Sequence, residues 1–213
     1  TMSLLAQFLF LLLPFLVAAE DKTLPVRELV HRLIPSHADQ IGLFLDLKTP
    51  NGTVAKVCVT SSIDKYGIEI HGSDVNTLAT GVLFYLNSVN ASVSWEATGG
   101  DNLEAALPPV GVPLPQVEGE ICRETTFAHR YYFNVCTYGY STAFWSWERW
   151  EKELDWMALH GINLPLAGLG AEFVWSEVFE NDFGIPREDL SDFFPGPAYL
   201  PWHWMGNLDK WKG

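Results

Sequence analysis

The first hundred residues alternate short apolar runs with turn signals, a pattern that predicts the strands and helices of a small domain. Residues 41–47 (IGLFLDL) and 54–62 (VAKVCVTSS) are rich in apolar and β-branched side chains, with a Pro-Asn-Gly turn between them, so each is predicted as a strand. Residues 67–73 (GIEIHGS) alternate apolar and polar positions and predict a third strand. The other predicted elements are helices at 25–33 and 74–89 and a last strand at 92–97.

A second pattern begins at Arg130, where a strand, a helix and another strand follow one another through short connections. Residues 130–137 (RYYFNVCT) alternate, and the apolar face with Tyr131, Phe133 and Val135 is expected to meet a helix layer. Residues 147–157 repeat apolar side chains with helical spacing, and residues 162–166 (INLPL) form a short apolar run. Such strand–helix repetition predicts a parallel sheet. Helices at 171–179 and 187–194 follow, and then a loop rich in Pro, Gly and Trp at 195–207.

Two kinds of parallel sheet compete for this second unit. A dinucleotide-binding fold needs GxGxxG after its strand, but Gly168 and Gly170 are followed by Phe173 in the third position, which disfavours it. A (β/α)8 barrel takes about 250 residues, so the region from Arg130 to the end holds two of its eight steps.

The fold class predicted is therefore α/β, a small N-terminal α/β domain followed by the first βα units of an incomplete (β/α)8 TIM barrel. The Pro- and Gly-rich segment between the two units is read as a linker that an edge strand could precede or interrupt. The predicted division is a signal peptide at 1–19, the N-terminal domain at 20–98, the linker at 99–129 and the truncated start of the catalytic barrel at 130–213.

The apolar N-terminal run indicates the secretory pathway. Residues 4–17 are apolar apart from Gln7, and small residues precede a cleavage point after Ala19, as in a signal peptide. The alternative is an uncleaved anchor, although Pro14 interrupts a run that is short for a membrane span. The sequons at Asn51 and Asn90 fit a glycoprotein of this route, with a lysosomal, vacuolar or secreted destination and no stable membrane anchor after cleavage.

Composition excludes several classes of partner and cofactor. A net charge of −13 argues against nucleic acid and against anionic membrane surfaces, because both attract clustered Lys and Arg. The three cysteines include no CxxC and the histidines no HExxH, so no metal or other cofactor is predicted. An odd cysteine count leaves one thiol unpaired unless its partner lies elsewhere.

Two clusters of side chains lie where a barrel enzyme keeps its site. Asn134 and Cys136 come at the carboxyl end of the first barrel strand, the face that carries catalytic loops. The loop with Trp202, Trp204 and Met205 would lie at the same mouth and suits the apolar face of a sugar ring. The alternatives are satisfied interior residues for the first cluster and a hydrophobic flap for the second.

Glu172 is the best carboxylate in the chain for glycoside hydrolysis, but that reaction needs two carboxyl groups. Glu177 and Glu180 look like solvated helix positions, so we identify no catalytic residue in this chain. The alternative role for Glu172 is to brace a turn or to cap a helix.

The stretch RYYFNVCTYGYSTAFWSWERWEKELDWMALHGINLPLA, followed by Glu172, Trp175, FFPGPAYLPW and MGNL, resembles the lysosomal α-N-acetylglucosaminidase family. Residues 25–98 are similar to that family's N-terminal domain, with weaker motifs. The resemblance implies a retaining exo-hydrolase that removes terminal α-linked N-acetylglucosamine, in animals from heparan sulfate. It also implies that both catalytic glutamates lie on later strands and that a helical domain follows the barrel. The residues that it implies for the sugar pocket are Asn134, Cys136, Trp202 and Met205.

The chain departs from the family pattern at several positions. The family usually has W-S-G-Q-E or similar where this chain has the GLGAE stretch ending at Glu172, and Ala and Arg are expected where it has Pro201 and Trp204. If Cys136 lines the pocket, Cys58 and Cys122 are left as a disulfide pair.

The function predicted is the N-terminal portion of a glycosidase acting on a carbohydrate with terminal N-acetylglucosamine, inactive as this fragment alone. A partial barrel exposes sheet edges and should be poorly stable by itself. The alternative is a non-catalytic secreted module that binds a glycan or a protein partner. A homo-oligomeric form of the full-length enzyme is left open.

Overall fold

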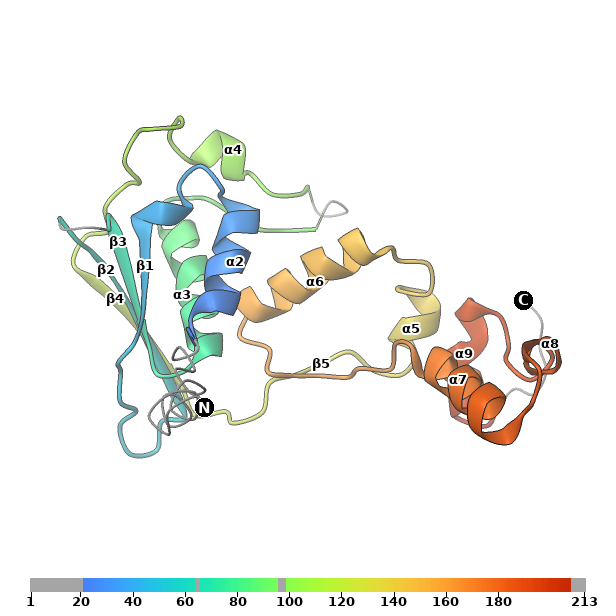
Figure 1. Cartoon of the computed structure of the whole chain (residues 1–213). Coiled ribbons are helices and arrows are strands. Elements are labelled where there is room, and N and C mark those ends of the chain that lie inside the picture. Colours follow the sequence, from blue (N-terminus) through green and yellow to red (C-terminus); the bar gives the residue numbers. More distant parts are fainter. Residues whose placement is uncertain (1–20, 64–65, 96–98, 208–213) are drawn as a thin grey trace, which may run out of the picture.

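A four-stranded mixed sheet forms the first unit of the chain (Figure 1). The computed structural model describes residues 21–63, 66–95 and 99–207, and the predicted signal peptide lies outside these ranges. The strand order is β1-β3-β2-β4, with β1 and β3 parallel and the other two pairs antiparallel. The strands are β1 (Ile41–Leu45), β2 (Ala55–Ser61), β3 (Ile68–Gly72) and β4 (Glu120–Thr125).

Two helices, α2 (Leu24–Leu33) and α3 (Val75–Ser88), cover one face of this sheet (Figure 1). Asp74 caps α3 in a reciprocal box, because its carboxylate accepts from the Thr77 N–H at 2.9 Å while the Thr77 hydroxyl accepts from the Asp74 N–H at 3.1 Å. Gly81 lets α3 approach closely, since a Cβ there would lie 2.4 Å from Cγ2 of Ile70.

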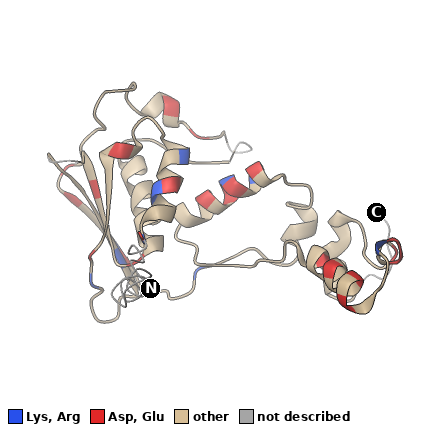
Figure 2. Cartoon of the chain, in the orientation of Figure 1, with Lys and Arg blue, Asp and Glu red and all other residues tan. Residues whose placement is uncertain are grey.

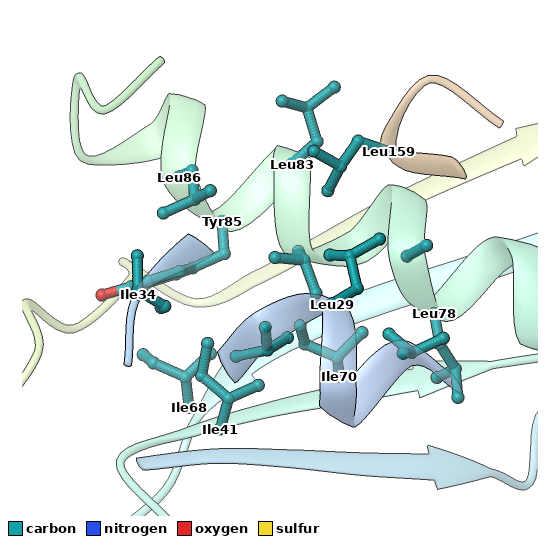
Figure 3. Close-up of a cluster of buried hydrophobic side chains, with 14 of the residues drawn as sticks. Leu29, Ile34, Ile41, Ile68, Ile70, Leu78, Leu83, Tyr85, Leu86 and Leu159 are labelled. Carbon is teal, nitrogen blue, oxygen red and sulfur yellow. The ribbon is translucent and has the colours of Figure 1, made fainter. Parts of the chain in front are cut away.

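The core lies between the sheet and these helices (Figure 3). Its apolar side chains come from alternate positions of the strands and from the inner stripes of the helices, as burial on one face requires. Leu159, at the end of the later helix α6, is fully buried in the same cluster and so connects the second unit to the first. Residues at its centre include Leu29, Ile68, Ile70, Leu78, Leu83 and Leu86.

Three of the strands and both helices predicted for the first unit are present, but two expectations need correction. Residues 92–95 of the predicted last strand form no strand, and residues 96–97 lie outside the described ranges. The segment 99–129, expected as a linker that an edge strand could interrupt, carries such a strand in β4, and it also carries the unpredicted short helix α4 (Leu103–Ala106). Leu114, from the same segment, belongs to the core. The linker therefore contributes to the first unit, because its apolar residues complete the sheet and core.

The second unit contains the first βα steps that the sequence predicted. Strand β5 (Tyr131–Tyr132) leads through helix α6 (Trp147–Leu159) to a parallel strand β6 (Leu164–Pro165), and helix α7 (Ala171–Phe183) follows. Ser146 caps α6 by accepting from the Arg149 N–H at 3.4 Å.

Pro165 fits its strand because its missing N–H is not needed for the ladder. The hydrogen bonds toward β5 come from Leu164 N to Arg130 O at 3.2 Å and from Leu166 N to Tyr132 O at 2.9 Å. Alternate N–H groups of a strand point to opposite sides, so the residue between these two donors faces away from β5. Pro165 therefore removes no hydrogen bond from the β5–β6 pair.

The strands of this unit are shorter than predicted. Residues 130–137 were expected as one strand, but Phe133 has φ 69° and the chain turns there into the short helix α5 (Thr137–Tyr140). The loop expected at 195–207 is also partly helical. Its elements and the preceding helix are α8 (Arg187–Leu190), η3 (Pro197–Tyr199) and α9 (Leu200–Trp204).

Arg130 joins the two units at the point where the chain passes between them. Its guanidinium donates to Asn76 Oδ1 of α3 at 2.8 Å, to Phe127 O at 2.8 Å and to the carbonyl of Gly161 after α6. Asn76 in turn donates to Ile162 O at 3.1 Å. These bonds tie the turn that follows α6 to α3 of the first unit.

Acidic residues recur along both α6 and α7, whereas basic residues are fewer and scattered (Figure 2). In the parts of the chain that the structure describes, no helix is long and apolar enough to cross a bilayer.

Candidate functional site

Asn134 occupies a tight turn at the end of β5. Its Oδ1 accepts from the Thr137 N–H at 3.1 Å and from the Thr137 hydroxyl at 3.3 Å, so the side-chain oxygen holds the start of α5. The residue is exposed, and its Nδ2 group makes no hydrogen bond within the described part of the chain. A fixed amide with a spare donor can bind a ligand oxygen.

The backbone before Asn134 is held in a conformation that non-glycine residues rarely adopt. Phe133 has φ 69°, a left-handed conformation that needs support from its surroundings. Its ring lies 4.4 Å from that of Tyr132, 5.9 Å from that of Tyr138 and 5.8 Å from that of Trp150. This aromatic packing against α6 holds the turn and fixes the direction in which Asn134 leaves the strand.

The predicted alternation of faces along this strand is wrong for Tyr131 and Tyr132, whereas Phe133 meets α6 as expected. Tyr131, Phe133 and Val135 were expected to meet the helix layer, but Tyr131 is 57% exposed. Tyr132 and Phe133 instead both contact α6, Tyr132 through Trp156 at 5.5 Å between ring centroids and Phe133 through Trp150. The turn at Phe133 breaks the period of two on which the prediction rested.

Cys136 is a free, half-buried thiol at the N-terminal end of α5. Helix α5 packs on α9, and Gly139 is the contact point, because a Cβ there would lie 2.5 Å from Cζ3 of Trp202 and 2.6 Å from Ala198 O. The Trp202 ring meets Tyr140 edge-on at 5.2 Å. The structure therefore places Trp202 against the helix that begins beside Asn134 and Cys136.

Met205 follows α9 and is 42% exposed. Its N–H donates to Pro201 O at 3.1 Å, which fixes its backbone but not its side chain. Pro201, one of the departures from the family pattern, is fully buried at the start of α9. A proline is accepted there because the first helical N–H groups have no intrahelical partner.

Glu172 braces a turn rather than standing ready for catalysis. Its carboxylate, in the first turn of α7, accepts from the indole N–H of Trp204. Glu177 and Glu180, expected as solvated positions, are partly exposed and pair with Arg187. Each of the three acidic candidates thus has a partner other than a substrate.

A cleft of about 1320 Å³ lies between the first unit and α6. Asn134 lines it together with Tyr132, Trp95 and Trp156, whereas Cys136, Trp202 and Met205 do not. The rings of Trp95 and Trp156 lie 5.2 Å apart. Sequence reasoning did not single out these cleft aromatics. Trp95 and Trp156 are far apart in sequence, so only the packing of the two units shows that they line the same cleft.

The floor of this cleft contains a buried carboxylate. Glu153 is 1% exposed and accepts from the Tyr132 hydroxyl at 3.0 Å and from Arg149 at 2.8 Å. Burial, followed by the hydrogen bond to Glu153, raises the pKa of Tyr132 to about 12. The Arg149 guanidinium also lies 3.8 Å from the centre of the Trp145 ring, a cation–π contact.

Cys58 and Cys122 form a disulfide between directly opposed residues of β2 and β4, which confirms the pairing left by elimination. With Glu120 they make the one group in the described ranges whose atoms are close enough to hold a metal. Their sulfurs are bonded to each other, however, and a disulfide supplies no thiolate ligand.

Two family models match this chain in order. Residues 24–115 match the N-terminal domain of alpha-N-acetylglucosaminidase (NAGLU), and residues 130–213 match its tim-barrel domain. Human alpha-N-acetylglucosaminidase is 42% identical over 147 residues, which cover 68% of this chain and 19% of that protein.

Solved structures give the same result. A family 89 glycoside hydrolase from Clostridium perfringens in complex with PUGNAc is 32% identical with a TM-score of 0.74, covering 90% of this chain and 21% of that one. A variant of the Clostridium enzyme with two Glu-to-Gln substitutions, in complex with its substrate GlcNAc-alpha-1,4-galactose, matches with the same values. The chain thus spans about a fifth of the length of these relatives. It belongs to the α-N-acetylglucosaminidase family of glycoside hydrolases.

Proposed function

We propose that this chain is the N-terminal part of a retaining exo-glycosidase that removes terminal α-linked N-acetylglucosamine from glycans such as heparan sulfate. The observation that carries the proposal is the likeness over 90% of the chain to a family 89 enzyme solved with GlcNAc-alpha-1,4-galactose. The two domain matches, in the same order along the chain, support it.

In this proposal the chain supplies part of the sugar pocket. Asn134 donates its amide N–H to a hydroxyl or acetamido oxygen of the sugar, a role supported by its fixed turn and spare donor. Trp202 offers an apolar ring face, and Cys136 and Met205 shape the wall. The remainder of the pocket, together with the groups that close it, comes from later barrel strands.

The chain alone is expected to be inactive. Retention requires a nucleophile and an acid/base carboxyl group about 5–5.5 Å apart. Glu172 is bonded to Trp204, and Glu177 and Glu180 are paired with Arg187. The proposed catalytic pair therefore lies on later strands, where one carboxylate attacks the anomeric carbon and the other protonates the leaving oxygen and then activates water.

The proposal includes passage through the secretory pathway to a lysosome, a vacuole or the medium. The apolar run at 4–17 supports a signal peptide cleaved after Ala19. Asn51 and Asn90 are both exposed, as acceptors of N-glycans must be. Enzymatic removal of N-glycans should lower the mass of the secreted protein, and the variants Asn51→Gln and Asn90→Gln should each lose one step of that shift.

The decisive experiment is an assay of the whole protein encoded with this chain on an α-N-acetylglucosaminide at acid pH. Hydrolysis should be selective against the β-anomer and against an α-glucoside that lacks the acetamido group. NMR of the first product should show the α-anomer, since two inversions retain configuration. Intact folding without turnover would overturn the proposal.

Asn134→Ala should raise KM for this substrate, with Asn87→Ala, an exposed change on α3, as the matched control. Sugar binding by a folded, monomeric 213-residue chain, combined with an inactive whole protein, would favour the alternative of a non-catalytic glycan-binding module.

A further inference from the structure

The side chain of Trp204 connects helix α9 to the second βα turn, the segment between β6 and the start of α7. Its indole N–H donates to the Glu172 carboxylate at the start of α7, across 32 residues of sequence. Its ring meets that of Tyr138 edge-on at 5.8 Å. The backbone of the turn also touches it, because a Cβ on Gly168 would lie 3.1 Å from the Trp204 ring.

The first βα turn, the segment after β5 that includes α5, is bonded to the second βα turn. Tyr138 is 5% exposed and its hydroxyl donates to the carbonyl of Leu166, just after β6. Trp204 therefore packs where the segments after β5 and β6 meet. It is held there from three sides, by Glu172, by Tyr138 and by Gly168.

The position of α9 depends on such contacts because the helix has only five residues. Helices of this length do not persist on their own in water. The helix carries Trp202, whose ring lies against Gly139 and Tyr140, and it ends at Met205. A contact that fixes Trp204 therefore also fixes Trp202 and Met205, two of the residues proposed to line the sugar pocket.

We infer that Glu172 and Trp204 form a latch that positions the sugar-binding wall, so that both are positioning residues rather than catalytic ones. The inference rests on the proposed function for its kinetic meaning. It also gives a physical account of a departure from the family pattern, since an indole N–H and the expected Arg guanidinium can both donate to the Glu172 carboxylate.

Four variants of the whole protein test the latch. Trp204→Phe keeps the ring but loses the donor, whereas Trp204→Arg keeps a donor. Glu172→Ala loses the acceptor, whereas Glu172→Gln keeps one. Trp147→Phe and Glu188→Ala, at exposed positions on α6 and α8, are matched controls.

For Trp204→Phe and Glu172→Ala we expect KM to rise about tenfold, which corresponds to about 1.4 kcal/mol, with kcat within about twofold. The double variant should add little to either single change, because both remove the same interaction. Glu172→Gln and both controls should stay within about twofold of the wild type. Trp204→Arg keeps a donor but loses the ring contacts with Tyr138 and Gly168, so its KM should lie between those of Trp204→Phe and the wild type. A merely structural role would not separate variants that keep a donor or acceptor from variants that lose it.

Hydrogen exchange gives a second readout that does not need activity. The amides of Met205 and Asn207, which donate to Pro201 O at 3.1 Å and Trp202 O at 2.8 Å, should lose protection in the two disabling variants only. If the wild type is inactive, the proposed function fails. The hydrogen-exchange measurement then still tests whether Glu172 and Trp204 hold α9 in place.

Unchanged exchange in Trp204→Phe and Glu172→Ala, or a Trp204→Arg variant that behaves like Trp204→Phe, would overturn the inference. If Trp204→Phe does not fold, the Glu172→Ala and Glu172→Gln pair gives the same comparison.

Discussion

Arg32 of α2 donates two hydrogen bonds, of 2.8 and 2.5 Å, to the carboxylate of Asp155 in α6, across 123 residues of sequence. The guanidinium fork matches the carboxylate geometry, which makes such pairs the strongest of the side-chain hydrogen bonds. Asp155 is largely buried, with 12% of its side chain exposed, whereas Arg32 is 39% exposed. The pair attaches α6 to α2 of the first unit, in addition to the bonds of Arg130.

Replacing Asp155 by Ala should lower the free energy of unfolding by about 1–3 kcal/mol, because a partly buried guanidinium loses its partner. Chemical denaturation of the protein measures the change. The matched control is Asp21→Ala, which breaks the exposed pair with Arg27, where the side chains are 46% and 53% exposed. That change should lower stability much less, because water screens an exposed pair. Equal effects at the two sites would contradict the assignment.

The disulfide between Cys58 and Cys122 ties the edge strand β4 to the centre of the sheet across 64 residues. Replacing both by Ser should cost about 2–4 kcal/mol, since the unfolded chain regains the freedom of that loop. Thermal unfolding with and without reductant measures it, and reductant should affect the wild type only.

Cys136→Ser is the control for this prediction, because that thiol is free. Non-reduced peptide mapping should recover the Cys58 and Cys122 peptides joined together. A Cys136 peptide joined to either one would show that the pairing differs.

Sequence patterns predicted the first unit well, because its elements bury one face against a single core. Strands near 41, 55 and 68 and the helix capped by Asp74 follow from alternation, helical spacing and cap chemistry. Strand β4 was read as part of a linker because its burial is only partial and its partner β2 is distant in sequence. Long-range pairing leaves little local signal.

The candidate site was harder to predict, since its geometry depends on one unusual backbone angle and on packing between distant segments. The left-handed Phe133 ends β5 early and places Asn134 in a turn, where its side-chain oxygen accepts from the Thr137 N–H. The use of Glu172 as a partner for Trp204 requires α9 to return to the second turn. Neither relationship follows from periodicity, although a bracing role for Glu172 was among the alternatives.

The raised pKa of Tyr132, about 12, predicts a loss of stability at high pH. Because the folded state favours the neutral phenol, this contribution is fully present below the ordinary tyrosine pKa of about 10 and disappears as the pH rises toward 12. The free energy of unfolding should therefore fall across that interval. Burial also raises the pKa of Tyr85, so other phenols add to the slope.

Tyr132→Phe isolates this contribution. It should lower stability by roughly 1 kcal/mol at pH 8, since the bond to the buried Glu153 is lost, and it should flatten the decline between about pH 10 and 12. Denaturation at stepped pH measures both effects. An unchanged slope in the variant would mean that the Tyr132 phenol does not carry the predicted linkage.

Gly139 is predicted to tolerate no side chain, because the backbone of η3 and the Trp202 ring of α9 both lie against α5 there. A Cβ would lie 2.5 Å from the Trp202 ring and 2.6 Å from the carbonyl of Ala198, and the carbonyl belongs to backbone that cannot rotate away. Gly139→Ala should therefore cost about 1–3 kcal/mol of stability and should displace Trp202, weakening binding of an N-acetylglucosamine analogue by the whole protein.

Gly67→Ala is the control, because a Cβ there meets only atoms 3.8 Å away. Thermal unfolding and calorimetric titration of both variants separate packing from binding. A Gly139→Ala protein with wild-type stability and affinity would show that α5 and α9 are not held together as described, and it would remove the packing on which the proposed sugar wall depends.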